Sequence, residues 1–141
     1  MAEYVWSESW VKKASTGTRA RFSGEAWQAT ATFTLTGEKA SFTGVRPSEA
    51  FEPVKGKWGA LELAGRVNGI DIGTEAFQEG ILDPTKSVRK AFAWTIGLNW
   101  ILSRNIKQVV NVERTTFIGG AQGGASRPAE NAFFIRTQVS F

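Results

Sequence analysis

Apolar and polar residues alternate over residues 131–141, the C-terminal end of the chain. Successive side chains of a β-strand point to opposite faces, so one face can meet lipid while the other faces a water-filled lumen. The alternation and the terminal aromatic residue predict the closing strand of an outer-membrane β-barrel. A half-buried strand of a soluble sandwich would show the same alternation. The residues expected to carry the barrel's assembly signal are Phe133, Ile135, Val139 and Phe141.

The same period of two recurs along the rest of the chain. It is clearest over residues 27–36, where threonines alternate with apolar residues, a pattern that leaves little room for a helix. Turn residues separate the segments, and the fold class they predict is all-β, an antiparallel meander of about six strands. The other expected strands cover residues 3–13, 58–72, 92–100 and 106–117.

Composition narrows the class of protein further. The 141 residues are 42% hydrophobic, which suits one globular domain over residues 1–141. Apolar stretches are only a few residues long, so no helix of about 20 apolar residues can cross a bilayer. Cysteine and histidine are absent, which removes thiol nucleophiles, imidazole bases and zinc sites with such ligands. We therefore expect no enzyme, no metal and no cofactor.

Charge is mixed rather than clustered. The net charge is +4, and no basic stripe interleaved with aromatic residues suggests nucleic acid. The total supports a modest attraction for anions. The N-terminal residues lack a basic leader followed by an apolar core, so no secretory signal is expected there. For an exported barrel this predicts a mature form with an added Met or a piece of a longer chain.

Four short sequence words resemble one known family in their order. They are FTLTGE at residues 33–38, GALELAGR at 59–66, TIGLNW at 95–100, and residues 130–141. Together they resemble the C-terminal portion of the phosphate-selective porin family, porins O and P, from about residue 33 onward, while the first 32 residues fit only loosely. The resemblance implies a 16-stranded, trimeric anion channel in the bacterial outer membrane.

Strand number and parity give further expectations. Six strands cannot close a barrel, because single-chain membrane barrels begin at about 8 strands. The chain should therefore be one part of a barrel, completed by strands from the same or other chains. With a periplasmic C-terminus, residues 14–20, 74–89 and 118–128 lie outside the cell, and residues 103–105 form a periplasmic turn. The long connection 39–57 is then periplasmic as well.

Charged and polar residues on the lumen-facing positions are the candidate pore lining. Fixed cations lower the cost of bringing an anion into a narrow path. The resemblance matches Arg66 and Arg136 to arginines in the family's corresponding strands. The simpler alternative is that Arg66 or Arg136 only pairs with Glu62 or Glu113 in a wet lumen. The candidates are Glu62, Arg66, Lys107, Glu113, Arg136 and Gln138.

Four tryptophans are expected near strand ends, where indole rings form girdles at the membrane interfaces. They are Trp27, Trp58, Trp94 and Trp100. The favoured function is a passive outer-membrane channel segment for small anions such as phosphate, in a homotrimer that contacts lipid and the barrel-assembly machinery. A non-transporting scaffold or wall subunit and a soluble β-barrel binder are the alternatives.

Overall fold

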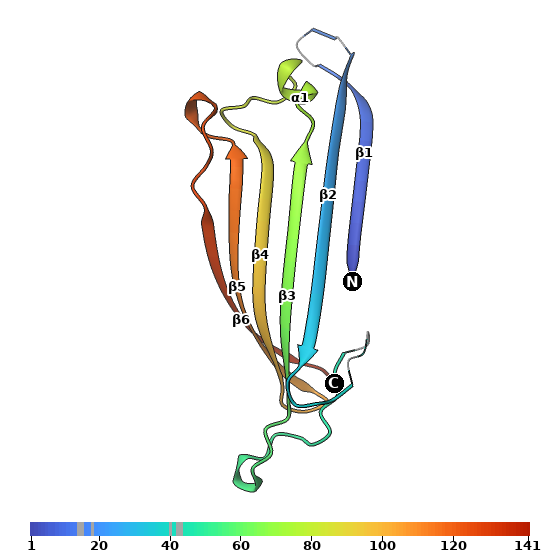
Figure 1. The fold of residues 1–141 in the computed structure, drawn as a ribbon, viewed down its shortest axis with the longest axis vertical. Coiled ribbons are helices and arrows are strands. Elements are labelled where there is room, and N and C mark those ends of the chain that lie inside the picture. Colours follow the sequence, from blue (N-terminus) through green and yellow to red (C-terminus); the bar gives the residue numbers. More distant parts are fainter. Residues whose placement is uncertain (14–15, 18, 40, 42–43) are drawn as a thin grey trace. The chain divides into compact units, whose positions relative to one another are not determined.

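Six strands follow one another through a single sheet in the order β1-β2-β3-β4-β5-β6 (Figure 1). The computed structural model describes residues 1–13, 16–17, 19–39, 41 and 44–141. The expected all-β antiparallel meander is confirmed. The strands are β1 (Ala2–Lys12), β2 (Arg19–Thr34), β3 (Ala60–Ile72), β4 (Val88–Ile101), β5 (Ile106–Gly119) and β6 (Glu130–Val139).

Helical structure in the described residues is short. It consists of the four-residue helix α1 (Glu75–Gln78) and two three-residue 3-10 turns, η1 (Pro53–Lys55) and η2 (Gln122–Gly124). No helix in the described ranges is long and apolar enough to cross a membrane. The turn expected at residues 103–105 is present between β4 and β5, where the backbone N–H of Ser103 donates to Ile106 O at 3.2 Å.

The chain divides into two compact units. Unit 1 comprises Met1–Ala29, Val67–Trp94 and Arg114–Glu130, and unit 2 comprises Thr30–Arg66, Thr95–Glu113 and Asn131–Phe141. Strands β2 to β5 contribute residues to both units. Parts of two expected loops, residues 14–15, 18, 40 and 42–43, lie outside the described residues. That residues 1–141 form a single domain stays a prediction.

Several strand ends differ from the sequence expectation, and the largest difference is at the start of β2. β2 begins at Arg19, eight residues before Trp27, because its first half pairs with β1 in the register Glu8↔Ser23 and Trp10↔Arg21. An ion pair of 2.7 Å joins Arg21 to Glu8 there. The last strand ends at Val139, so Phe141 follows the strand instead of closing it.

Hydrophobic residues are mostly exposed. Among the described residues the buried set consists largely of alanines, and a buried cluster in unit 2 joins Val45, Ala60 and Ile101. Ile96 is 55% exposed and Phe133 64%. In a soluble protein, side chains of this size would be covered to gain the free energy of burial. The side of the described sheet that carries Ile96 and Phe133 therefore needs an apolar partner.

Candidate pore face

Contacts between side chains on different strands of unit 2 define a polar face. Asn99 Nδ2 donates to Glu62 Oε1 at 2.6 Å, and Thr95 Oγ1 donates to Glu113 Oε2 at 2.8 Å. Arg66 approaches the same Glu113 oxygen at 3.5 Å. β3, β4 and β5 thus turn these five side chains to one side, as the period-two pattern predicted. We call this side the polar face and the opposite side the apolar face.

All six sequence-predicted pore residues belong to unit 2. Glu62, Lys107 and Gln138 line one hollow of about 250 Å³. Arg66 and Glu113 line a second of about 470 Å³. Arg136 lies on β6 and is exposed. The structure therefore brings five of the six into two hollows and leaves Arg136 beside them on the strand that carries Gln138.

Arg66 and Glu113 form the pairing that the simpler alternative anticipated. Only one guanidinium nitrogen, Nη2, lies within ion-pair distance, and the side chains are 47% and 26% exposed. Exposed ion pairs contribute about 0–1 kcal/mol. The pair is therefore weak, and a competing group in the lumen could separate Arg66 from Glu113.

The other acidic candidate, Glu62, accepts a hydrogen bond from the Asn99 amide and is not paired with a cation in the described residues. Within the described residues, neither Lys107 nor Arg136 lies within 4.0 Å of a carboxylate. Pairing of Arg136 with Glu62 or Glu113, which the sequence left open, is therefore not observed. Two cations of this face remain uncompensated.

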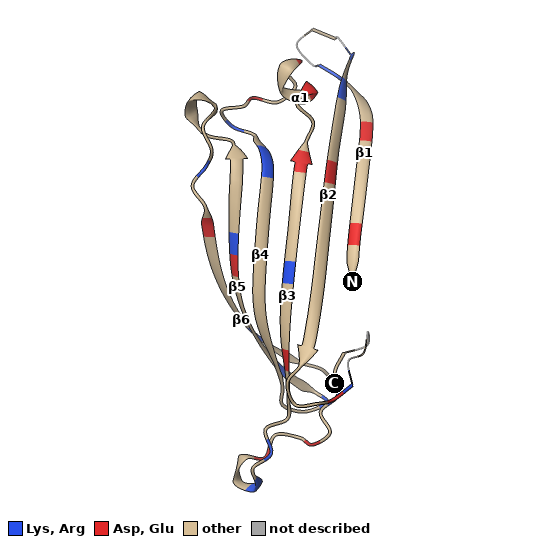
Figure 2. Ribbon diagram, viewed as in Figure 1, with Lys and Arg blue, Asp and Glu red and all other residues tan. Residues whose placement is uncertain are grey.

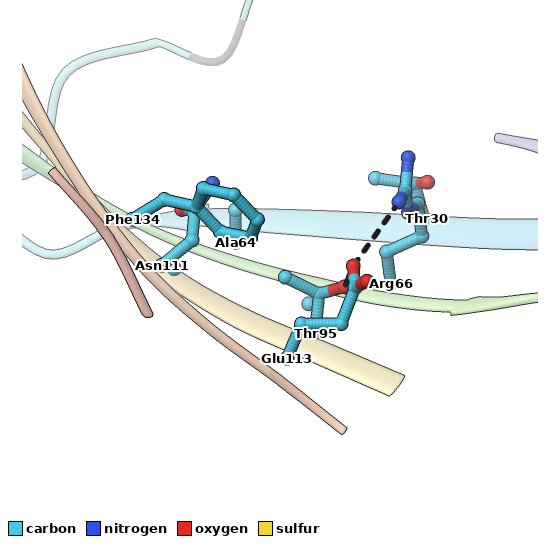
Figure 3. Close-up of a pocket in the computed structure, with 9 residues that line it drawn as sticks. Thr30, Ala64, Arg66, Thr95, Asn111, Glu113 and Phe134 are labelled. Carbon is cyan, nitrogen blue, oxygen red and sulfur yellow. Dashed lines mark hydrogen bonds and ion pairs between the residues drawn. The ribbon is translucent and has the colours of Figure 1, made fainter. Parts of the chain in front are cut away.

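The larger hollow contains residues that were not predicted as site residues. It is bounded by Thr30, Thr95, Asn111 and Phe134, with Ala64 and Gly97 among its small residues. Figure 3 shows Phe134 and Asn111 on one side of it and the Arg66–Glu113 pair with Thr95 on the other. The sequence signal that could have identified Phe134 is its place as a single aromatic residue in the same alternate set as Arg136 and Gln138.

Two of the four tryptophans come together at one end of unit 2. Trp100 Nε1 donates to the backbone oxygen of Trp58 at 2.7 Å. The ring of Phe51 lies 5.9 Å from that of Trp58 and 5.2 Å from that of Trp100. Phe51, which sequence analysis missed, comes from the long connection after β2 and is tied there by its N–H to Leu102 O at 2.7 Å. The three rings form one aromatic cluster, and the role of Trp58 and Trp100 in an interfacial girdle stays a prediction.

Trp27 and Trp94 do not lie at strand ends. Each falls near the middle of its strand, β2 or β4, and this part of the expectation is wrong because the strands extend past the apolar pattern. Trp27 nevertheless stands where its face of β2 changes from charged Glu25 to apolar residues. It packs over Gly69, where a Cβ would lie 2.8 Å from the indole nitrogen, and its ring centroid is 6.1 Å from that of Phe92.

The stretch of alternating apolar residues on a single strand is as long as a transmembrane strand requires. On β4 the charge is confined to the first residues, Arg89 and Lys90 (Figure 2). Alternate apolar residues then run from Phe92 to Trp100, about nine residues, and on β2 they run from Trp27 to Leu35, beyond the strand's last residue. A transmembrane strand needs roughly 9–11 residues.

Gln108 is a polar residue among the alternate apolar residues of β5. Thr137 Oγ1 donates to Gln108 Oε1 at 3.0 Å, so Gln108 belongs to the apolar face with Ile106, Val110 and Val112. A polar group facing hydrocarbon is costly unless it is hydrogen-bonded. The contact therefore explains how β5 can carry Gln108 on this side.

An antiparallel meander with a polar face, an exposed apolar face and aromatic residues near one strand end has the features of a porin-type β-sheet. The chain belongs to the phosphate-selective porin O and P family, whose model matches residues 2–141. The match thus extends to the N-terminal strands, which the sequence words covered only loosely. A search of curated proteins found no match, and neither did a search of the solved structures. Membership of this family makes the chain part of an outer-membrane channel protein and not of an enzyme.

Proposed function

We propose that the chain forms part of the wall of a passive channel for small anions such as phosphate in a bacterial outer membrane. The observation that carries the proposal is the uncompensated pair of cations, Lys107 and Arg136, on the polar face of unit 2. A cation that is not neutralised by a neighbouring carboxylate attracts anions within about a Debye length, ~8 Å at physiological ionic strength. The polar face is then the lumen side, and the apolar face meets lipid.

Further partners belong to the same proposal. The remaining strands of the wall come from the same or other chains, the barrel-assembly machinery recognises the last strand, and three barrels associate as a homotrimer. The chain is the C-terminal segment of such a barrel. The competing function is a non-transporting scaffold or wall subunit, in which Arg66 and Glu113 only hold neighbouring strands together.

Charge reversal in the complete barrel tests the channel. Reversal potentials are measured in a planar bilayer under a KCl gradient. Arg136→Glu should lower the anion preference more than Arg66→Glu, because Glu113 already compensates Arg66. Glu113→Gln should raise the preference, since it frees Arg66 and still accepts a hydrogen bond from Thr95. All three shifts should shrink at high salt.

The matched control is Lys55→Glu, which makes the same charge change in η1. That turn belongs to the connection that carries Phe51 to Trp100 on the apolar side, so its effect on selectivity should be small. Equal reversal potentials for the parent, Arg136→Glu and Glu113→Gln would contradict the channel proposal and favour a scaffold.

A further inference from the structure

Phe134 is an exposed aromatic residue on the polar face of unit 2. It belongs to the alternate set of β6 that includes Arg136 and Gln138, and it is 54% exposed. The opposite set of the same strand, which includes Phe133 and Ile135, belongs to the apolar face, whereas Phe134 lies on the polar face. A single exposed apolar side chain is common on protein surfaces, so the meaning of Phe134 depends on the groups beside it.

Small residues make room beside this ring. Gly97 lies next to Asn111, and a Cβ at position 97 would stand 2.3 Å from Asn111 Oδ1. Ala64 adds little bulk of its own. The resulting hollow of about 470 Å³ falls within the roughly 300–1,000 Å³ of small-molecule sites. The Asn111 amide therefore sits in the hollow instead of being pushed away by a β4 side chain.

The polar groups around the hollow are matched in number and in charge. Arg66 and the Asn111 amide nitrogen can donate hydrogen bonds, and Glu113 and the Asn111 oxygen can accept them. The hydroxyl of Thr95, which donates to Glu113, lines the same hollow. Arg66 and Glu113 cancel in formal charge. An anion drawn to Arg66 would meet the Glu113 carboxylate 3.5 Å away, so this hollow disfavours anions even if the channel conducts them.

We propose that the hollow is a subsite for an uncharged sugar ring. Each sugar hydroxyl both donates and accepts, which suits the mixed groups of Arg66, Glu113 and Asn111. The face of an aromatic ring carries partial negative charge, and the C–H face of the sugar packs against Phe134. The subsite goes beyond anion conduction and does not depend on it, since it uses the compensated pair and not Lys107 or Arg136.

Saturation-transfer NMR on the complete barrel in lipid nanodiscs tests the subsite, with methyl β-glucoside as the probe. The parent should transfer saturation to the ring C–H protons. Phe134→Ala should weaken binding about three- to tenfold, the size of one lost aromatic contact, while Phe134→Tyr should retain it. Phe33→Ala removes an exposed ring from the apolar face of β2 and should leave binding unchanged.

Two further arms keep the outcome decisive if Phe134→Ala folds poorly. Ala64→Leu fills the hollow without touching its polar groups and should abolish transfer, and inorganic phosphate at the same concentration should not displace the sugar. Equal transfer in the parent and Ala64→Leu, no transfer in the parent, or displacement by phosphate would each overturn the subsite. The reversal potentials report on the anion channel separately, so failure of one proposal is distinguishable from failure of the other.

Discussion

The Asp83 carboxylate organises the turn that leads into β4. Asp83 Oδ1 accepts from the Thr85 hydroxyl at 2.7 Å and from the Thr85 N–H at 2.9 Å, and Lys86 lies 3.6 Å from Oδ2. These hydrogen bonds, that of the Thr85 side chain first, hold the pKa of Asp83 below its ordinary value. The residue lies in a loop outside the strands, where such local contacts fix the chain direction.

The lowered pKa predicts how this turn responds to acid. Because the pKa of Asp83 is lowered in the folded protein, Asp83 stabilises the fold at pH values above its pKa in the unfolded chain, about 3.9. This stabilisation is lost as the pH falls through the pKa of the folded state. Thr85→Val removes the hydroxyl and should raise the pKa of Asp83 toward its ordinary value, whereas Thr85→Ser should not. NMR titration of the carboxyl carbon measures both, and an unchanged pKa in Thr85→Val would contradict the assignment.

The indole of Trp100 should matter more to stability than that of Trp94. Trp100→Phe deletes the hydrogen bond to Trp58 O and should lower the free energy of unfolding by about 1 kcal/mol. In the part of the chain that the structure describes, the Trp94 indole has no hydrogen-bond partner, so Trp94→Phe is the matched control. Urea unfolding from lipid vesicles gives the comparison, and equal losses would mean that the Trp100 bond contributes nothing.

At the scale of the strand, the alternation determines the face of each side chain and little else. Thr95 bonds to Glu113 on the polar face, while its neighbour Ile96 is exposed on the apolar face. A cation on a lipid-facing position costs roughly 2–4 kcal/mol near the midplane. Ile96→Arg, like Leu63→Arg, should therefore abolish insertion of the complete barrel, and Thr95→Arg should be tolerated.

The folded fraction in vesicles, measured by the mobility shift of the unheated barrel on a gel, reads out this difference. Thr95→Arg serves as the control for Ile96→Arg because it puts the same side chain one residue away in the same strand. Equal insertion of the two variants would show that β4 is assigned to the wrong faces.

Strand existence, order and facing could be predicted because each depends on local alternation and turn residues. The start of β2 could not, since residues 19–26 lack a regular apolar pattern and are extended by pairing with β1. The partners within the site could not be predicted either, because they also depend on pairing between strands. Alternation places Glu62 and Arg66 on one face, but only the register between strands brings Asn99 to Glu62 and leaves Arg66 with Glu113.

At the scale of the whole molecule, the backbone groups on the outer edges of the two edge strands need hydrogen-bond partners. β1 and β6 are the outer strands of the described sheet, and each presents one row of backbone N–H and C=O groups without a strand beside it. In hydrocarbon each unsatisfied group costs several kcal/mol. The proposed barrel wall therefore predicts further strands along both edges.

Hydrogen exchange can detect those strands directly. In the complete barrel in lipid, amides of β1 and β6 should exchange as slowly as those of the central strands β3 and β4, because every one of them is then paired. When the present chain is placed alone in detergent, only the edge strands should exchange fast. Mass spectrometry of peptides from residues 2–12 and 130–139 gives both rates. Fast exchange of β6 in the lipid-embedded barrel would mean that this edge is not closed by neighbouring strands, and the chain would then not be part of a continuous wall.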